Sequence, residues 1–279
     1  MAKKHRPQLT NAARPATYEV EAYNERGEMV PTSIAGEHPL TLYLDKRELV
    51  TLMTLGHAPE ALAIGFLRNQ RLVAAIGDIK AVQVDWETES VAVTTNKKSD
   101  IGKKTRKKTV TTGCGQGTVY GDLMEEIDSI KLRDDVSLAD TDLFVLIEKV
   151  RRHETIYKQA GAVHGCALAT REGDILMFVE DVGRHNAVDA IAGFMWLEGV
   201  DGSDKVFYTT GRLTSEMVIK CAQMRIPFLV SRSGLTKMGH DIAQQVGLTM
   251  IGRASGRHYL AFAGKHRLKL TAPQPTALA

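Results

Sequence analysis

Cysteine is scarce in this sequence of 279 residues, which contains three, at positions 114, 166 and 221. An odd and sparse set does not indicate a disulfide framework, so we expect a chain that works in a reducing compartment. Long hydrophobic runs are also missing. No stretch reaches the length of a membrane span, and the basic residues 1–14 contain no apolar segment typical of a secretory signal. We therefore expect a cytoplasmic protein without a membrane partner.

Excess charge is nearly absent too, because the formal net charge is only +3. That value gives no reason to expect a nucleic-acid partner. Positive charge is nevertheless concentrated in residues 97–108, where Asp100 is the only acidic residue. Such a run favours either a local anionic partner or a solvated linker. Hydrophobic residues make up 43% and charged residues 25% of the chain, which is typical of a soluble globular protein of one large or two ordinary domains.

Hydrophobic patterns predict an α/β fold of mixed α+β character. The first part should contain strands at 18–23, 40–44, 49–53, 79–86 and 90–95, with a helix that opens at Pro59. In the second part, a tight turn joins strands 163–169 and 175–179, which should be antiparallel. Helices and strands then alternate to residue 251, which predicts right-handed crossovers and parallel strands in a mixed sheet with helices on both faces.

The composition also predicts where the chain divides. Residues 1–110 should form a small N-terminal α+β lobe that ends in the basic linker 97–110. Residues 111–279 should form a cysteine loop followed by the domain that carries the mixed sheet. No internal repeat is visible.

A glycine-rich segment at residues 111–118 holds Cys114 and no apolar side chain. Glycine permits backbone conformations that other residues avoid, so this segment is expected to be an exposed loop. Positive charge favours the thiolate, which is the nucleophilic form, and the lysine-rich residues 97–108 lie just upstream. Cys114 is therefore the candidate catalytic residue. The alternative is that Cys114 is an incidental loop residue and that the lysines form a solvated linker.

Three strand-to-helix connections, at 180–186, 209–215 and 231–236, each contain a glycine and an arginine. Ligands of open α/β sheets bind beyond the carboxyl ends of the strands, where helix N-termini and arginines attract phosphate. Together the connections predict a site for a phosphorylated ligand. The candidate binding residues are Gly183, Arg184, His185, Asn186, Gly211, Arg212 and Ser233. The alternative is that these residues only cap helices, as Ser, Thr, Asp and Asn commonly do.

The order of strands and helices in the second part is similar to that of nucleobase deaminases, which raises an enzymatic alternative. Those enzymes hold zinc through His-x-Glu and Pro-Cys-x-x-Cys motifs. Here His164-Gly165-Cys166 lacks the glutamate, and residues 211–214 contain no cysteine. His164 and His185 also have no second ligand at metal-binding spacing. We therefore predict no metal site and no zinc.

Three runs of this sequence resemble the formate dehydrogenase accessory sulfurtransferases, the FdhD family. They are residues 161–164 (Gly-Ala-Val-His), the long run 180–189 and residues 211–217. The earlier segments 37–40 and 63–67 are similar to that family as well. The resemblance extends from about residue 18 to residue 268.

The resemblance implies a main domain like cytidine deaminase without its zinc, and a homodimer. It also implies that the loop cysteine accepts sulfur from a cysteine desulfurase as a persulfide. The sulfur then goes to the molybdenum or tungsten of a bis-molybdopterin guanine dinucleotide cofactor, the bound substrate, on its way to formate dehydrogenase. The cofactor-binding segment of the family corresponds here to Arg253, Ala254, Ser255, Gly256 and Arg257, of which Gly256 and Arg257 match.

The sequence departs from the family in the loop itself. The family usually has Cys-x-x-Cys, whereas this chain has Cys114-Gly115-Gln116-Gly117. One thiolate can still carry a persulfide, because transfer uses one nucleophilic sulfur at a time. An internal disulfide step is lost, and Cys166 and Cys221, which could replace the missing thiol, are expected to be buried. The missing cysteine motivates an alternative function, in which the chain binds and delivers the cofactor without transferring sulfur.

Overall fold

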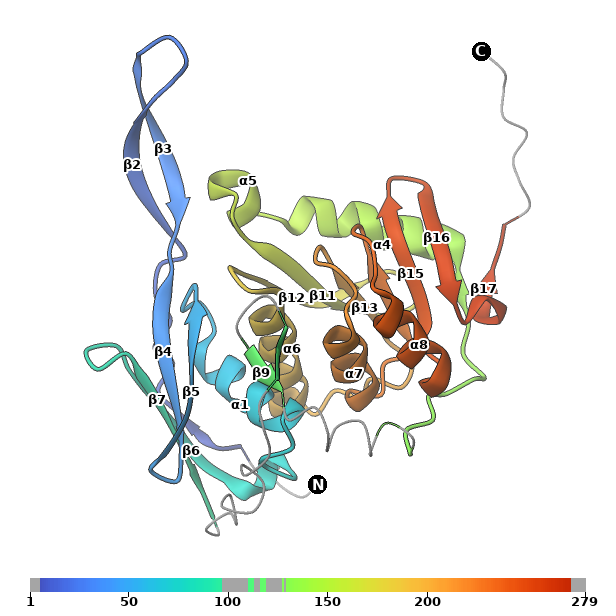
Figure 1. Ribbon diagram of the computed structural model, residues 1–279, viewed down its shortest axis with the longest axis horizontal. Helices are drawn as coiled ribbons and strands as arrows, with labels where there is room; N and C mark the ends of the chain where they lie inside the picture. Colours follow the sequence, from blue (N-terminus) through green and yellow to red (C-terminus); the bar gives the residue numbers. More distant parts are fainter. Residues whose placement is uncertain (1–5, 97–109, 113–115, 119–126, 128, 272–279) are drawn as a thin grey trace.

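The computed structural model describes residues 6–96, 110–112, 116–118, 127 and 129–271. A six-stranded mixed sheet, here called the main sheet, has the strand order β12-β11-β13-β14-β15-β16 (Figure 1). Its strands are β11 (His164–Ala169), β12 (Ile175–Asp181), β13 (Val206–Thr209), β14 (Phe228–Ser231), β15 (Thr249–Ser255) and β16 (His258–Ala263). The pair β11 and β12 is antiparallel, whereas β13, β14 and β15 are parallel. Both predicted features are confirmed.

Helices cover both faces of the main sheet, as the alternating pattern predicts. They are α4 (Asp140–His153), α5 (Ile156–Ala160), α6 (Arg184–Glu198), α7 (Ser215–Gln223) and α8 (Lys237–Val246). On one face, α4 buries Leu143, Leu146 and Val150, whose helical spacing places them against the strands. On the other face, α6, α7 and α8 bury their apolar residues in a second core.

The N-terminal part is built on a five-stranded sheet of order β1-β6-β7-β4-β5. Its strands are β1 (Gln8–Leu9), β4 (His38–Leu44), β5 (Arg47–Thr54), β6 (Ile79–Asp85) and β7 (Ser90–Thr95), and its helix is α1 (Pro59–Asn69). The expected helix opening at Pro59 and the hairpin of β6 and β7 are confirmed. A separate hairpin of β2 (Thr17–Tyr23) and β3 (Met29–Ala35) extends from the body (Figure 1).

Helices α1 and α6 join the N-terminal part to the main sheet. Two glycines allow their close approach: a Cβ at Gly65 would lie 1.6 Å from the Asp189 carbonyl oxygen, and one at Gly193 would lie 1.9 Å from that of Ala61. One continuous core contains residues from both parts, including Leu40 and Ile191. The division of the chain near residue 110 stays a prediction.

Several elements differ from the sequence-based expectation. Strands β3 and β16 were not predicted. Most of their residues are exposed or only half-buried, so their sequences show little alternation of hydrophobic and polar residues. Helix α5 has five residues, too few for a helical period. Strand β15 continues to Ser255 and therefore includes residues expected to form a ligand loop. The segment 111–118, expected to be a loop throughout, is instead partly a hairpin: β8 (Val110–Thr112) pairs with β9 (Gln116–Thr118), and residues 113–115 lie outside the described residues.

Candidate functional site

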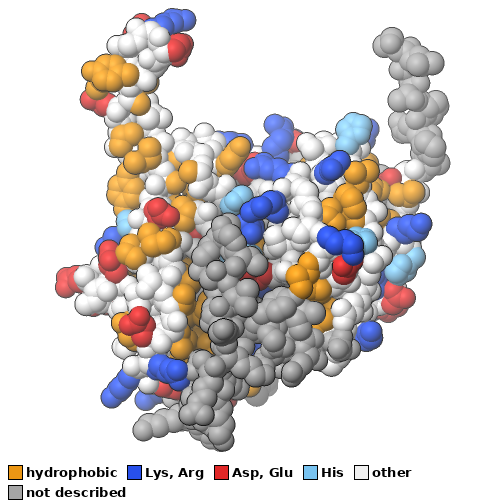
Figure 2. Space-filling view, viewed as in Figure 1, with side chains coloured by type: hydrophobic (Ala, Val, Ile, Leu, Met, Phe, Trp, Pro, Cys, Tyr) orange, Lys and Arg blue, Asp and Glu red, His pale blue; other side chains and the backbone are white. Residues whose placement is uncertain are grey.

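The three polar connections meet at one edge of the main sheet. Strands β12, β13, β14 and β15 all run in the same direction, so their carboxyl ends lie together, while β11 begins there. Figure 2 shows Lys and Arg side chains gathered on the face near α5, β13 and β15. We call this region the arginine edge and define it by four residues, His164, Arg212, Arg232 and Arg253. The predicted meeting of the connections at a single edge is thus confirmed.

The connection after β12 turns its polar side chains into the protein. The buried carboxylate of Asp181 accepts hydrogen bonds from Thr54 Oγ1 at 2.5 Å and from the Leu55 amide at 3.2 Å, both in the N-terminal part. Asn186 donates to Asp181 Oδ1 at 2.8 Å and to the Met53 carbonyl at 2.6 Å. Burial raises the pKa of Asp181, and its hydrogen bonds oppose that shift. This connection therefore locks the N-terminal part onto the main sheet.

The neighbouring acid, Glu180, points the other way, as expected for adjacent residues at a strand end. Its carboxylate accepts hydrogen bonds from the backbone amides of Thr155, Ile156 and Tyr157, at 2.9 to 3.0 Å. These amides open α5 and have no partner inside their own helix. Glu180 therefore fixes α5 beside the sheet edge.

His185, a predicted binding residue, lies in a buried polar cluster between α6 and α7. Its ring is 1% exposed, and Nε2 lies 3.5 Å from Glu216 Oε2. In the same cluster, Lys220 Nζ contacts Asp189 Oδ2 at 2.8 Å, and Asn69 of α1 donates to Asp189 Oδ1 at 2.7 Å. Burial, with Lys220 as the next cause, lowers the pKa of His185 to about 2. The ring is therefore neutral and acts on the edge only through the residues around it.

Gly183, Arg184 and Gly211 hold the first two connections against each other. A Cβ at Gly211 would lie 2.7 Å from Arg184 Cδ, so the arginine stem lies directly on that glycine. Gly183 precedes α6 and has the Asn186 side chain beside it. Arg184 is only 3% exposed, whereas Arg212, which follows Gly211, faces solvent. Of these predicted residues, Arg212 is the one whose side chain is exposed at the edge.

The connection after β14 carries an arginine that was not among the predicted binding residues. Arg232 Nη1 lies 3.0 Å from Glu154 Oε1, and its guanidinium lies 5.0 Å from the centre of the Tyr157 ring. These two contacts orient the cation at the arginine edge. The predicted residue, Ser233, is half-buried, and its amide donates to Ser231 Oγ at 2.9 Å. The presence of Arg232 within the polar run 231–236 was the available sequence signal.

Only the first residue of the segment Arg253–Arg257 lies at the arginine edge. Arg253 is exposed, has a positive φ of 54° and donates from its amide to the Ser233 carbonyl at 2.9 Å, so it joins the third connection. The Ala254 side chain is buried in the core beneath α4. Ser255 and Gly256 are exposed at the turn into β16. Arg257 lies over the Phe144 ring of α4, on the sheet face opposite α6 and α7.

His164 opens β11, which lies between β12 and β13 at the edge, and was not among the predicted binding residues. Its half-buried ring contacts Thr210 Oγ1 through Nδ1 at 3.3 Å. Burial, followed by the charges of Arg184, Arg232 and Arg212, lowers the pKa of His164. The three connections therefore place their arginines around one imidazole. A lone histidine in sequence gave no sign of this, because its neighbours are 20 to 68 residues away along the chain.

The thiols of Cys166 and Cys221 are both fully buried, as expected. Cys166 donates to Thr209 Oγ1 at 3.3 Å, and burial raises its pKa to about 12. Burial also raises the pKa of Cys221 well above its ordinary value. Neither thiol is available as a nucleophile. Cys114 lies outside the described residues. In the sequence it falls between β8, which ends at Thr112, and β9, which begins at Gln116.

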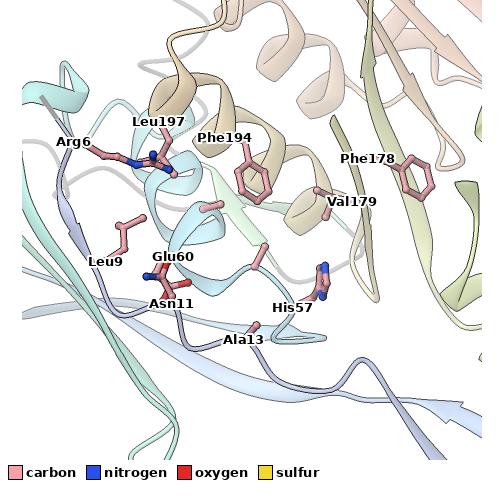
Figure 3. Close-up of a pocket in the computed structure, with 12 residues that line it drawn as sticks. Arg6, Leu9, Asn11, Ala13, His57, Glu60, Phe178, Val179, Phe194 and Leu197 are labelled. Atoms are coloured by element: carbon pink, nitrogen blue, oxygen red, sulfur yellow. The ribbon is translucent and has the colours of Figure 1, made fainter. Parts of the chain in front are cut away.

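The remaining candidate sites in the described part of the chain would be clusters of metal ligands and enclosed hollows. No cluster of three or more His, Cys, Asp or Glu residues suited to a metal is found there. A hollow of about 290 Å³ lies between the N-terminal segment, α1, β12 and α6 (Figure 3). Its lining is mainly apolar, with His57 and Glu60 among the polar residues. It borders the joint between the two parts and is lined by none of the four residues that define the arginine edge. Within the described residues, no helix is long and apolar enough to cross a membrane.

Fold and site together define a class: a mixed α/β protein with exposed arginines at the carboxyl ends of parallel strands. Comparison with known proteins makes the assignment specific. Residues 35–269 match the model of the FdhD/NarQ family, and the chain belongs to that family.

Relatives and a solved structure agree with this assignment. The chain is 30% identical over 242 residues to the sulfur carrier protein FdhD of Listeria innocua, which covers 86% of this chain and 92% of the relative. It is 30% identical over 250 residues to the protein of that name from Sulfurisphaera tokodaii, with coverage of 88% and 95%. A putative formate dehydrogenase accessory protein from Desulfotalea psychrophila superposes with a TM-score of 0.76 at 25% identity. That match covers 91% of this chain and all of the solved one.

Proposed function

We propose that this protein is a sulfur carrier that serves formate dehydrogenase. Cys114 accepts sulfur from a cysteine desulfurase as a persulfide. The sulfur is then delivered to the molybdenum or tungsten of a bis-molybdopterin guanine dinucleotide cofactor bound at the arginine edge. The names of the relatives support the sulfur-carrier role, and that of the solved structure supports the link to formate dehydrogenase.

The observation that carries the proposal is the state of the three thiols. The chain has three cysteines, and two of them are fully buried with raised pKa values. A carrier thiol has to reach a partner's active site and react as the thiolate. Cys114, which follows the lysine-rich residues 97–108, is the one cysteine not excluded by burial.

The arginine edge suits the nucleotide end of the cofactor. Guanidinium groups bind phosphate oxygens through paired hydrogen bonds, and exposed Arg212 and Arg253 can provide them without disturbing the core. Arg232 is already oriented by Glu154 and Tyr157. The guanine dinucleotide contains several phosphates. Their negative charge complements the positive charge of the arginines, and their oxygens accept the hydrogen bonds that guanidinium groups donate.

The sulfur-loading step uses one thiolate. The Cys114 sulfur attacks the terminal sulfur of the desulfurase persulfide, the sulfur–sulfur bond of the donor breaks, and the desulfurase cysteine leaves as its thiolate. Gly117 stands where the family usually has a second cysteine. Because the remaining thiols are buried, a thiol from outside this chain supplies the two electrons when sulfur leaves Cys114 as sulfide. That thiol is left disulfide-bonded to Cys114 and is released by a second external thiol.

Loading of sulfur on Cys114 tests the proposal directly. The purified protein is incubated with a desulfurase and cysteine, and its mass is measured before and after reduction. We expect one added sulfur that reductant removes, located on the peptide that contains Cys114. Cys166→Ala and Cys221→Ala are the matched controls and should keep the adduct, whereas Cys114→Ala should lose it together with formate dehydrogenase maturation. Normal maturation with Cys114→Ala would overturn the proposal.

The missing second cysteine favours an alternative, in which the protein binds and delivers the cofactor without carrying sulfur. The same mass measurement separates the two, because a passive carrier gains no reducible sulfur on Cys114. The proposal also includes a homodimer in the cytoplasm, which sedimentation analysis at several protein concentrations would test.

A further inference from the structure

His164 lies at the β11 end of the arginine edge, between β12 and β13, with one ring nitrogen in use. Its Nδ1 lies 3.3 Å from Thr210 Oγ1, and the same oxygen accepts a hydrogen bond from the Gly165 amide at 3.1 Å. Among the described residues, no hydrogen bond reaches Nε2. The ring is therefore held by a strand-end hydroxyl while its second nitrogen remains for a ligand.

The Thr210 hydroxyl suits either protonation state of the ring. A hydroxyl oxygen can accept two hydrogen bonds and donate one. Thr210 can therefore donate to Nδ1 of a neutral ring, or accept from Nδ1–H, while it still accepts from the Gly165 amide. A change of charge on the imidazole thus needs only a rotation of one hydroxyl hydrogen.

The surroundings of the ring are strongly cationic. Arg184 at the start of α6, Arg212 after β13 and Arg232 after β14 all act on the imidazole and disfavour its charged form. Buried His185 is neutral and adds no charge, and Asp181 stands opposite His164 on β12. The Asp181 carboxylate is occupied by its hydrogen bonds to residues 54, 55, 183 and 186. A bound anion would therefore be the largest new negative charge near His164.

We propose that His164 is a proton-accepting phosphate ligand: its Nε2–H donates to a phosphate oxygen of the bound nucleotide, and the ring gains one proton on binding. This inference rests on the proposed function only for the phosphate site, and it does not depend on the sulfur of Cys114. The proton comes from solvent and completes the pair Nδ1–H and Nε2–H. Nδ1–H donates to Thr210, and no bond between heavy atoms forms or breaks.

The direction of the pH effect follows from linkage. Burial, followed by the charges of the arginines, holds the pKa of His164 below its ordinary value in the free protein. A phosphate beside the ring raises that pKa, so between the two pKa values the complex holds one proton more than the free protein. Affinity for the nucleotide therefore rises as the pH falls through this interval, by up to about tenfold per pH unit.

The test is a calorimetric titration of the full chain with guanosine diphosphate from about pH 5.5 to 8.5, in two buffers of different ionisation heat. The wild-type protein should take up more protons than His164→Gln, a comparison that cancels titration of the ligand and of Cys114. Because the glutamine amide replaces Nε2–H but cannot titrate, this variant should keep the affinity that the wild type has at high pH. His164→Ala loses the donor and should bind about tenfold more weakly at low pH.

A matched control is His266→Gln, since His266 is an exposed histidine that contacts Asp134 far from the edge. This variant should keep the wild-type proton uptake. Equal proton uptake in the wild type and His164→Gln would overturn the proposal. So would equal affinity of the wild type and His164→Ala at low pH. Guanosine diphosphate that does not bind the wild type at all would overturn the phosphate site itself. Sulfur loading on Cys114, measured separately, would remain intact in each case if only this inference is wrong.

Discussion

The connection after β12 and those after β13 and β14 use similar residues for different purposes. In the first, Asp181 and Asn186 are buried and bind the N-terminal part. In the other two, Arg212 and Arg232 reach the surface at the sheet edge. The difference lies in what covers each connection. The N-terminal part and α1 cover the first, so its polar groups find protein partners, whereas Arg212 and Arg232 of the other two are exposed.

This contrast indicates that polar runs of similar composition have separable roles: one joins parts of the fold, and the others provide the exposed arginines that we propose bind an anion. Substitutions in the buried layer should lower stability first. Substitutions in the exposed layer should lower ligand affinity and leave stability unchanged. The following predictions test the two layers in order of decreasing effect.

The largest loss of stability is expected from Lys220→Met. Lys220 is buried and its ammonium contacts both Asp189 and Glu216, so its removal takes the cation away from a buried acidic pair. The free energy of unfolding should fall by about 3 to 5 kcal/mol, measured by urea denaturation. Adding Asp189→Asn should recover part of the loss. The exposed pair Lys237–Asp241 provides the control Lys237→Met, with an expected change below about 0.5 kcal/mol. A small effect at Lys220 would contradict the structural role of the buried cluster.

Asp181→Ala should follow, with a loss of about 3 kcal/mol. The change leaves Thr54, the Leu55 amide and Asn186 without their shared acceptor. Thermal unfolding compared with that of Asp174→Ala, an exposed acid next to β12, measures the effect. Because Asp181 joins the two parts, hydrogen exchange should also increase at residues 53–55. Unchanged exchange at residues 53–55 would show that Asp181 does not hold the N-terminal part against the main sheet.

Gly193→Ala tests how closely α1 and α6 approach. The new methyl group would overlap the Ala61 carbonyl, so the helices must move apart, at a cost of about 1 to 3 kcal/mol. Gly77→Ala is the control, because a Cβ there meets nothing within 4 Å. Equal stability of the two variants in chemical denaturation would show that the helix contact yields without cost.

Buried His185 should make stability depend on pH. Its pKa is lowered to about 2 in the folded protein, so the unfolded chain takes up its proton first as the pH falls below the ordinary value of 6.5. Its contribution is present above that value and is lost below it, at about 1.4 kcal/mol per pH unit. Unfolding measured between about pH 7 and 5 should show this slope. His185→Gln should reduce this slope. An unchanged slope would show that other groups cause the pH dependence of stability.

The smallest effect on stability is expected at the exposed layer. Arg212→Ala should change the free energy of unfolding by less than about 0.5 kcal/mol, because the side chain faces solvent. The same variant should weaken guanosine diphosphate about tenfold, through loss of a charge-assisted contact. Arg225→Ala, an exposed arginine after α7, is the control for charge alone and should leave affinity unchanged. If both variants lost affinity equally, the nucleotide would be attracted by the overall positive charge of the protein and not by a site at Arg212.

Much of the fold could be predicted from local patterns. Alternation marked β4, β6 and β7, and the regular succession of strands and helices gave the parallel order of β13, β14 and β15. Strand β16 was missed because it lies at an open edge and several of its side chains face solvent, so its sequence carries little alternation. Only the first strand of hairpin β2–β3 was predicted. Pro31 is unfavourable in a strand pattern and concealed the second strand, although β3 runs through it.

The site was predicted less completely, because burial depends on distant residues. Gly211 and Arg184 belong to separate runs, and only the fold shows one lying on the other. His185 and Arg212 both looked like ligands in sequence, yet α6 buries the first and the strand end exposes the second. His164 lacked any neighbouring signal, since its arginines come from other connections.

The sequence alone determined the strand and helix periods, the three polar connections and the number of thiols, because these are properties of short stretches of chain. Tertiary structure decided which polar groups bind protein and which face solvent. It also decided that two thiols are buried and that three arginines surround one imidazole. These features depend on contacts between residues far apart in the chain, and only the closing of the two parts around α1 and α6 brings them together.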